Sequence, residues 1–258
     1  GAARNAGLDH ACGMYVFFLD ADDYLFVRSA GPLLACCRQC RPDVLSFGMQ
    51  TVRHREQEQS NRAVRLRICY AGSGAGYMVG HNLRAAAWGY MFRRESLGEL
   101  RFVTGIFHED EAFTPRLWLQ AKHVCVTSLP VYAYYQRSDS IVHVSSREQL
   151  EKRMADLRQV LVGLKQEPVR NALQQQALRR RMETLASDVW WRLVCESPDT
   201  AFLRCQLGWF REAGFYPLPL RFYTLRYILM YIGSQCGMVS VFLNRMSHLK
   251  QLFSSKNQ

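Results

Sequence analysis

The sequence predicts an α/β domain over residues 1–145, followed by a helical, basic C-terminal region over residues 146–258. Three features support this fold class. Runs typical of strands alternate with runs typical of helices as far as residue 136, an order that favours an α/β fold. From Ser145 onward the apolar residues follow helical periodicity alone. An acidic cluster also directly follows a short apolar run, which is where open α/β sheets carry their ligands.

The composition suits a folded protein with a substantial core, and it limits the possible partners. The chain has 258 residues, of which 48% are hydrophobic and 21% are charged. A formal net charge of +11 favours anionic partners, namely nucleic acid, acidic lipid surfaces or phosphorylated substrates. The basic residues are spread along helices without an RNA- or DNA-binding motif, so we expect no nucleic-acid partner.

The cysteines indicate a reducing compartment. Nine cysteines without a disulfide framework fit a cytoplasmic protein. Cys36, Cys37 and Cys40 cluster on a predicted helix. A zinc site would need a second ligand pair, and no later Cys-x-x-Cys or His-x-x-x-His supplies one. We therefore expect these three thiols to pack as small apolar side chains.

The first half of the α/β domain is expected to combine three strands with one helix. Aromatic and β-branched enrichment predicts a buried strand at residues 15–19, which ends at the acidic cluster. Pro42 limits a helix predicted at residues 29–39. Two further strands are expected at residues 44–52 and 64–70.

The second half of the domain begins with a glycine-rich segment at residues 72–76. This segment is typical of a turn and lacks the features of a phosphate-binding loop. A helical stretch is expected around residues 77–84. Acidic residues in its first turn favour a helix at residues 108–120, because they complement the helix dipole. Two strands separated by a proline are expected at residues 124–127 and 131–136.

The C-terminal region is predicted to be mostly helical. Capping-box spacings at residues 145–149 precede an apolar helical face over residues 150–164. Pro168 suits the first turn of a further helix that reaches about Glu196. Residues 227–244 carry no formal charge and have about the minimum length of a membrane span, but Gly, Ser and Gln residues dilute them. We expect either a buried helix or a basic amphipathic helix lying on an anionic bilayer.

Two acidic groups could carry chemistry. Asp20 and Asp22 form an Asp-x-Asp after a strand, a hard-oxygen arrangement suited to Mg²⁺ or Mn²⁺ bridging a diphosphate. Glu109 and Asp110 begin the helix at residues 108–120. Each group also fits a simpler interpretation, either a solvated turn that caps the next helix or acids that favour a helix dipole.

Several motifs follow one another along residues 1 to about 145. They are Ala3-Arg-Asn-Ala-Gly-Leu8, Gly13-x-Tyr-x-x-Phe-Leu-Asp-Ala-Asp-Asp23, Trp88-Gly-Tyr-Met-Phe-Arg-Arg-Glu95, Arg101-Phe102, Glu109-Asp-Glu-x-Phe113 and Val131-Tyr-x-Tyr-Tyr-x-Arg-x-x-Ser-Ile141. In this order they resemble the middle of a family 2 glycosyltransferase of the bacterial surface-polysaccharide type. Several linked motifs are much more specific than any one of them.

The resemblance implies a GT-A fold, a Rossmann-like mixed sheet that binds a nucleoside-diphosphate sugar such as a UDP-sugar. It assigns Asp20 and Asp22 to binding of the diphosphate through Mg²⁺ or Mn²⁺, with Asp22 as the direct metal ligand. Arg4 and Asn5 match the family's segment near the nucleotide and donor, and are expected to bind this cosubstrate.

The resemblance also implies an inverting transfer to an acceptor hydroxyl. Asp110 would be the general base that deprotonates this hydroxyl, with Glu109 in support. Trp88 would present a flat apolar face to an acceptor sugar, although plain core packing explains it equally well. The acceptor would be a saccharide or a lipid-linked saccharide, and the basic tail would suit a cytoplasmic enzyme, peripheral at the inner membrane face.

The sequence departs from the family at its start. Members begin with a strand resembling Val-Ser-Val-Ile-Ile-Pro and an Asp-Asp-Gly-Ser segment that grips the nucleobase, and neither is present in these residues. We therefore expect a sheet that is incomplete at the N-terminus, an N-terminally truncated chain, and activity for the full-length protein. The alternative is a non-catalytic, degenerate glycosyltransferase-like protein that contacts a membrane surface or acts as a scaffold.

Overall fold

The structure is a computed structural model that describes residues 1–53, 65–136, 147–197 and 199–235. The described residues form two compact units. One unit comprises those within residues 1–144 and 162–178, and the other comprises those within residues 145–161 and 179–258. The predicted domain division between residues 145 and 146 stays a prediction.

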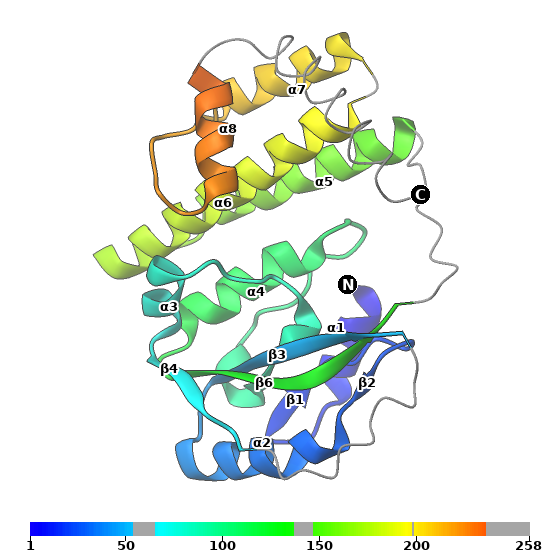
Figure 1. Ribbon diagram of the computed structural model, residues 1–258, viewed down its shortest axis with the longest axis vertical. Coiled ribbons are helices and arrows are strands. Elements are labelled where there is room, and N and C mark those ends of the chain that lie inside the picture. The colour runs from blue at the N-terminus through cyan, green and yellow to red at the C-terminus, as the bar shows by residue number, and fades with distance from the viewer. Residues whose placement is uncertain (54–64, 137–146, 198, 236–258) are drawn as a thin grey trace. The chain divides into compact units, whose positions relative to one another are not determined.

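A six-stranded mixed sheet forms the centre of the first unit (Figure 1). Its strands are β1 (Tyr15–Phe17), β2 (Tyr24–Leu25), β3 (Val44–Val52), β4 (Ile68–Gly72), β5 (Tyr90–Arg93) and β6 (Val124–Tyr135). The strand order is β1-β5-β3-β6-β2, and β4 also pairs with β6. Only β3 and β6 run parallel among these pairs; the other pairs are antiparallel. This mixed sheet confirms the predicted fold class.

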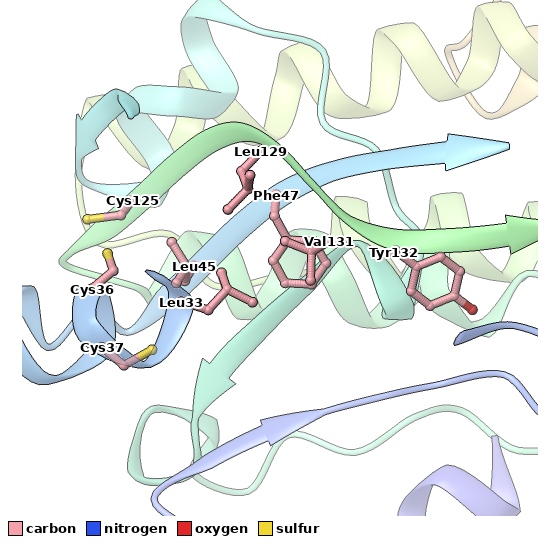
Figure 2. Packing of buried hydrophobic residues seen from close by; sticks show 9 residues of the cluster. All are labelled: Leu33, Cys36, Cys37, Leu45, Phe47, Cys125, Leu129, Val131 and Tyr132. Carbon is pink, nitrogen blue, oxygen red and sulfur yellow. The ribbon is translucent and has the colours of Figure 1, made fainter. Parts of the chain in front are cut away.

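Helices cover both faces of this sheet (Figure 1). The helices of the first unit are α1 (Ala2–His10), α2 (Val27–Cys40), α3 (Gly74–Gly80) and α4 (Glu109–Gln120), with short 3₁₀ turns at Ala87–Gly89 and Arg94–Leu97. The α2 helix packs Leu33, Cys36 and Cys37 against apolar side chains of β3 and β6 (Figure 2). The α4 helix lies on the opposite face (Figure 1) and buries Phe113, Leu117 and Trp118.

The C-terminal region is helical, as predicted, throughout its described elements. These are α5 (Arg147–Lys165), α6 (Ala172–Glu196), α7 (Thr200–Glu212) and α8 (Leu225–Gln235). Among the described residues, no helix combines the length and the apolar character needed to cross a membrane. Residues 145 and 146 of the predicted capping box, and residues 236–244 of the uncharged segment, lie outside the described residues.

The prediction of two strands around Pro130 is wrong, because β6 continues through it. Gly48 of β3 lies opposite Pro130, and the register shifts on either side of Gly48. A Cβ atom at Gly48 would lie 2.6 Å from the Ser128 carbonyl oxygen, so only glycine allows this close approach. The irregularity accommodates a residue that has no N–H to donate, and the strand is not interrupted.

Four other sequence-based expectations also differ from the structure. Residues 72–76 are not a turn: Ser73 caps α3, its hydroxyl accepting from the Gly76 N–H at 3.1 Å. The helix expected at residues 77–84 therefore ends at Gly80. The strand expected at residues 64–70 is β4, which starts at Ile68. The helix expected from Pro168 begins at Ala172 instead, after Asn171 accepts from the Gln174 N–H at 2.9 Å.

A single carboxylate joins the ends of three elements of the sheet. Asp43, just before β3, accepts from Arg93 and Ser96 at 2.9 Å each. Its other oxygen accepts from the backbone N–H groups of Lys122 and His123 at 2.8 and 3.0 Å. Burial alone would raise the pKa of Asp43, but these hydrogen bonds and the Arg93 charge outweigh it and lower the pKa.

We expect Asp43→Asn to lower the free energy of unfolding by about 2–4 kcal/mol, because an amide NH₂ would replace one acceptor oxygen opposite buried donors. Urea unfolding at pH 7 measures this. The matched control is Asp9→Asn, which removes an exposed pair with Arg101 at 3.1 Å and should cost less than about 1 kcal/mol. The lowered pKa means that the stabilisation by Asp43 is complete above about pH 4 and is lost as the pH falls through the folded-state pKa. Equal losses for the two variants at pH 7 would contradict the assigned role of Asp43.

Candidate active site

The acidic cluster forms the turn between β1 and β2, and the end of β6 holds it in place. The Asp23 carboxylate accepts from the Tyr132 hydroxyl and from the Tyr135 N–H, the latter at 2.8 Å. The Asp20 N–H in turn donates to the Tyr132 oxygen at 3.4 Å. Burial, followed by the Asp23 carboxylate, raises the pKa of Tyr132, so its hydroxyl remains a donor. Of the three aspartates, Asp23 is therefore structural.

The other two aspartates of this turn reach solvent. Asp22 is exposed, and the Asp20 side chain is 40% exposed. Carboxylate oxygens at this spacing are hard ligands that suit Mg²⁺ or Mn²⁺, and solvent access leaves coordination positions for water or phosphate oxygens. The donor set therefore fits the ion that the sequence predicts. Binding of a metal by Asp20 and Asp22 stays a prediction.

Arg4 of α1 connects this turn with the first residue of α4. Its guanidinium donates to the Glu109 carboxylate and lies 3.4 Å from Asp20 Oδ1. Burial alone would raise the pKa of Glu109, but its own backbone N–H and Arg4 lower it. Glu109 therefore stays ionised, and one arginine joins two acidic groups that are far apart in the sequence.

Asp110 follows Glu109 in the first turn of α4 and is partly exposed. Its Oδ1 accepts from the Glu111 N–H at 3.0 Å. The preceding His108 adopts a left-handed conformation with φ of 60°, which is uncommon for a residue with a side chain. This sharp change of direction sets where the first turn of α4 begins.

Asn5 uses its side chain to fasten the segment that leads to α4. Its amide NH₂ donates to the Phe102 carbonyl, and its amide oxygen accepts from the Phe102 N–H, both at 2.8 Å. Both hydrogen bonds are to the backbone, so Asn5 positions this segment independently of the side chain at residue 102. Contact of Asn5 with a nucleotide or donor stays a prediction.

Trp88 takes part in an aromatic stack beside the acidic turn. Its ring lies 4.6 Å from that of Tyr132 at an interplanar angle of 20°, and 6.4 Å from that of Tyr134. Arg84 lies 5.9 Å from the Trp88 ring centre. The stacking of Trp88 on Tyr132 agrees with the interpretation of Trp88 as a packing residue. Binding of an acceptor sugar by Trp88 stays a prediction. The sequence did not predict the hydrogen bond between Tyr132 and Asp23, although the aromatic Val131-Tyr-x-Tyr-Tyr motif lies at this end of the strand.

Comparisons with known proteins agree with this fold. No protein-family model matches the chain. Over 147 residues the chain is 26% identical to an Escherichia coli (strain K12) protein named uncharacterized glycosyltransferase YibD, a match that covers 54% of this chain and 43% of that protein. The chain thus spans less than half of that relative.

Solved structures show the same likeness of fold. The S. aureus TarS 1–349 crystal structure in complex with UDP-GlcNAc superposes with a TM-score of 0.52 at 17% identity, over 84% of this chain and 73% of that chain. A second crystal structure of S. aureus TarS 1–349 gives a TM-score of 0.50 at 16% identity, over 84% of this chain and 72% of that chain. The chain therefore has a mixed α/β fold of the GT-A type.

We expect Tyr132→Phe to lower the free energy of unfolding by about 1–2 kcal/mol, because Asp23 would lose its hydroxyl donor. Tyr134→Phe is the control. It removes the same atom from a ring that is 42% exposed, and should change stability by less than about 0.5 kcal/mol. Denaturant unfolding of both variants measures the difference. If Tyr134→Phe proved as costly as Tyr132→Phe, the hydrogen bond to Asp23 would not be what holds the turn.

Proposed function

We propose that this chain is the metal- and acceptor-binding part of an inverting glycosyltransferase. The enzyme would move a sugar from a nucleoside-diphosphate sugar to a hydroxyl of a saccharide or lipid-linked acceptor in polysaccharide biosynthesis. One observation carries the proposal: Arg4 contacts both Asp20 and Glu109, so the fold brings the Asp-x-Asp turn and the acids of α4 to one place. Similarity to a named glycosyltransferase and to a UDP-GlcNAc-bound structure supports it.

The acidic turn would bind the donor's diphosphate. Asp22 and Asp20 would hold Mg²⁺ or Mn²⁺, and the bound ion would neutralise the charge that develops on the departing diphosphate. Tyr132 contributes by keeping Asp23 and the turn fixed. Arg4 contributes a fixed positive charge beside Asp20, which orients that carboxylate and also favours a site for anions.

Asp110 would act as the general base. It would take the proton of the acceptor hydroxyl as the hydroxyl oxygen forms its bond to the anomeric carbon. The bond from that carbon to the diphosphate oxygen breaks, and the diphosphate leaves with the electron pair from the opposite side, which inverts the configuration. The pKa of Glu109 is lowered and its carboxylate is bound to Arg4, so Glu109 is the weaker base and suits a positioning role.

Two variants of the complete gene product test these roles. Asp22→Asn should weaken Mn²⁺-dependent binding of a nucleotide sugar at least about tenfold, since it removes a charged ligand oxygen. Asp110→Asn should leave donor binding within about twofold of wild type and lower kcat by about 10²–10⁴-fold, because only the proton transfer is lost. Glu99→Gln, an exposed carboxylate outside the site, is the control. Calorimetry and turnover against a panel of nucleotide sugars measure both quantities.

The alternative, a non-catalytic scaffold, predicts a different result. If no nucleotide sugar binds with Mn²⁺, or if Asp110→Asn turns over like wild type, the catalytic proposal fails. The scaffold function then takes its place.

The helical region suits contact with an anionic membrane surface. Residues 146–258 contain 17 Lys and Arg residues against nine Asp and Glu residues, a net charge of +8. On α8, Leu225, Leu229 and Ile232 are 75%, 44% and 51% exposed, at the spacing of one helical face. Phe222, just before α8, is 81% exposed. Apolar side chains on a basic region are typical of helices that lie in a bilayer interface.

We expect the double variant Leu225→Gln/Leu229→Gln to reduce binding to vesicles that contain anionic lipid at least about tenfold, because two apolar side chains no longer enter the interface. Co-sedimentation measures the bound fraction. Leu173→Gln, which changes a leucine of α6 that is 42% exposed, should bind as wild type does. Unchanged binding by the double variant would remove α8 from the proposed surface.

A further inference from the structure

Three cysteine thiols meet where α2 packs on the sheet. Cys36 and Cys40 lie one turn apart on α2, and Cys125 lies on β6. Their sulfur atoms are all within 4.8 Å of one another. Figure 2 shows the sulfur of Cys36 directed toward Cys125, whereas the sulfur of Cys37 points elsewhere; Cys37 instead lies 3.8 Å from the Met91 sulfur. The grouping is therefore selective among neighbouring cysteines.

A histidine ring lies beside one thiol of this cluster. His123 Nε2 lies 3.7 Å from Cys125 Sγ. His123 directly precedes β6 and Cys125 is two positions further on, a spacing that directs both side chains to the same side of an extended chain. The His123 backbone is held by Asp43, which accepts its N–H at 3.0 Å and donates to its carbonyl at 2.7 Å. The same carboxylate that joins the sheet ends thus also fixes the backbone that presents the imidazole.

We propose that Cys36, Cys40 and Cys125, with His123 as fourth ligand, form a structural site for Zn²⁺. A tetrahedral zinc ion with Zn–S bonds of about 2.3 Å and a Zn–N bond of about 2.1 Å separates its sulfurs by about 3.8 Å and sulfur from nitrogen by about 3.6 Å. The thiols would need to approach by about 1 Å at most. The His123 ring nitrogen lies near Cys125 but not within 4.8 Å of all three sulfurs, so the ring must move toward Cys36 and Cys40 to complete the site. Cys40 lies at the surface and provides a path of entry.

The ligand chemistry separates this site from the acidic turn. Three sulfurs and an imidazole select zinc or another soft cation, whereas Mg²⁺ and Mn²⁺ prefer carboxylate oxygens. Cys125 and Tyr132 are seven residues apart on β6, which places the two regions roughly 20 Å apart along the strand. The zinc site would thus pin the last turn of α2 to β6 and take no part in sugar transfer.

Binding would couple to protonation and to stability. Burial raises the pKa of the Cys36 and Cys125 thiols, so the metal-free cluster consists of neutral thiols, which suit the apolar core. Zn²⁺ would displace their protons on binding, and its binding free energy would add to the stability of the fold. This accounts for a cluster that packs well without metal and still has the geometry of a metal site.

The test uses the full chain, purified with reductant, and Zn²⁺ and Co²⁺ as probes. We expect one equivalent of Zn²⁺ by mass spectrometry of metals, a thiolate-to-cobalt charge-transfer band on Co²⁺ substitution, and a rise in Tm with Zn²⁺. Cys40→Ser changes a surface residue and should fold like wild type by circular dichroism, yet lose at least about tenfold in Zn²⁺ affinity. His123→Asn should also weaken binding. The control Cys12→Ser alters an exposed cysteine outside the cluster and should bind Zn²⁺ within about twofold of wild type.

Three outcomes would overturn the proposal. They are sub-stoichiometric Zn²⁺ in the reduced wild-type chain, equal affinity in Cys40→Ser and wild type, and loss of binding in Cys12→Ser to the same extent as in Cys40→Ser. A disulfide between two of the clustered cysteines in protein purified without reductant, together with no Zn²⁺ uptake after reduction, would instead identify a redox pair. None of these results bears on the acidic turn, so they leave the proposed glycosyl transfer to its own test.

Discussion

The backbone hydrogen bonds of β6 connect the separate parts of the first unit. Along one edge β6 pairs with β3 over almost its whole length, and along the other it pairs first with β4 and then with β2. Its first residues lie beside Asp43 and the clustered thiols, and its last residues hold Asp23. The position of the acidic turn therefore depends on a strand whose other end is anchored on α2.

The electrostatics of the candidate site depend on one arginine that contacts two carboxylates. Arg4 is shared between Asp20 and Glu109, and both partners are only partly buried, so the interaction remains accessible to water and ions. A divalent ion on Asp20 and Asp22 would compete with Arg4 for the Asp20 carboxylate. Arg4 would then retain Glu109, whose lowered pKa keeps it charged. The arrangement can thus accept an ion without leaving a buried charge uncompensated.

The sequence correctly predicted those helices and strands that depend only on residues close together in the chain. The helix at 109–120 follows from first-turn acids, and the strand at 44–52 follows from an apolar run. Pro130 misled the assignment of β6, because the effect of a proline depends on the residue opposite it, and Gly48 lies more than 80 residues away in sequence. The order of motifs predicted one site for Asp20, Asp110 and Arg4, but the hydrogen bonds that hold Asp23 could be recognised only from the position of the end of β6. The cysteines show the same limit, since spacing rules look for paired motifs, whereas the cluster joins Cys36 and Cys40 of α2 to the distant Cys125 of β6.

The irregular pairing at Gly48 and Pro130 also determines to which face of the sheet the side chains at the two ends of β6 point. Side chains alternate between the faces of a sheet, so a shift of one residue exchanges every face that follows it. Loss of a single residue from the segment between Cys125 and Tyr132 would preserve composition and most pairing, yet it would turn the Tyr132 hydroxyl away from Asp23. Any relative that lacks one residue in this short interval would need a compensating change in β3 to keep the acidic turn in place. The length of this interval is therefore as informative for recognising functional relatives as the identity of the aspartates themselves.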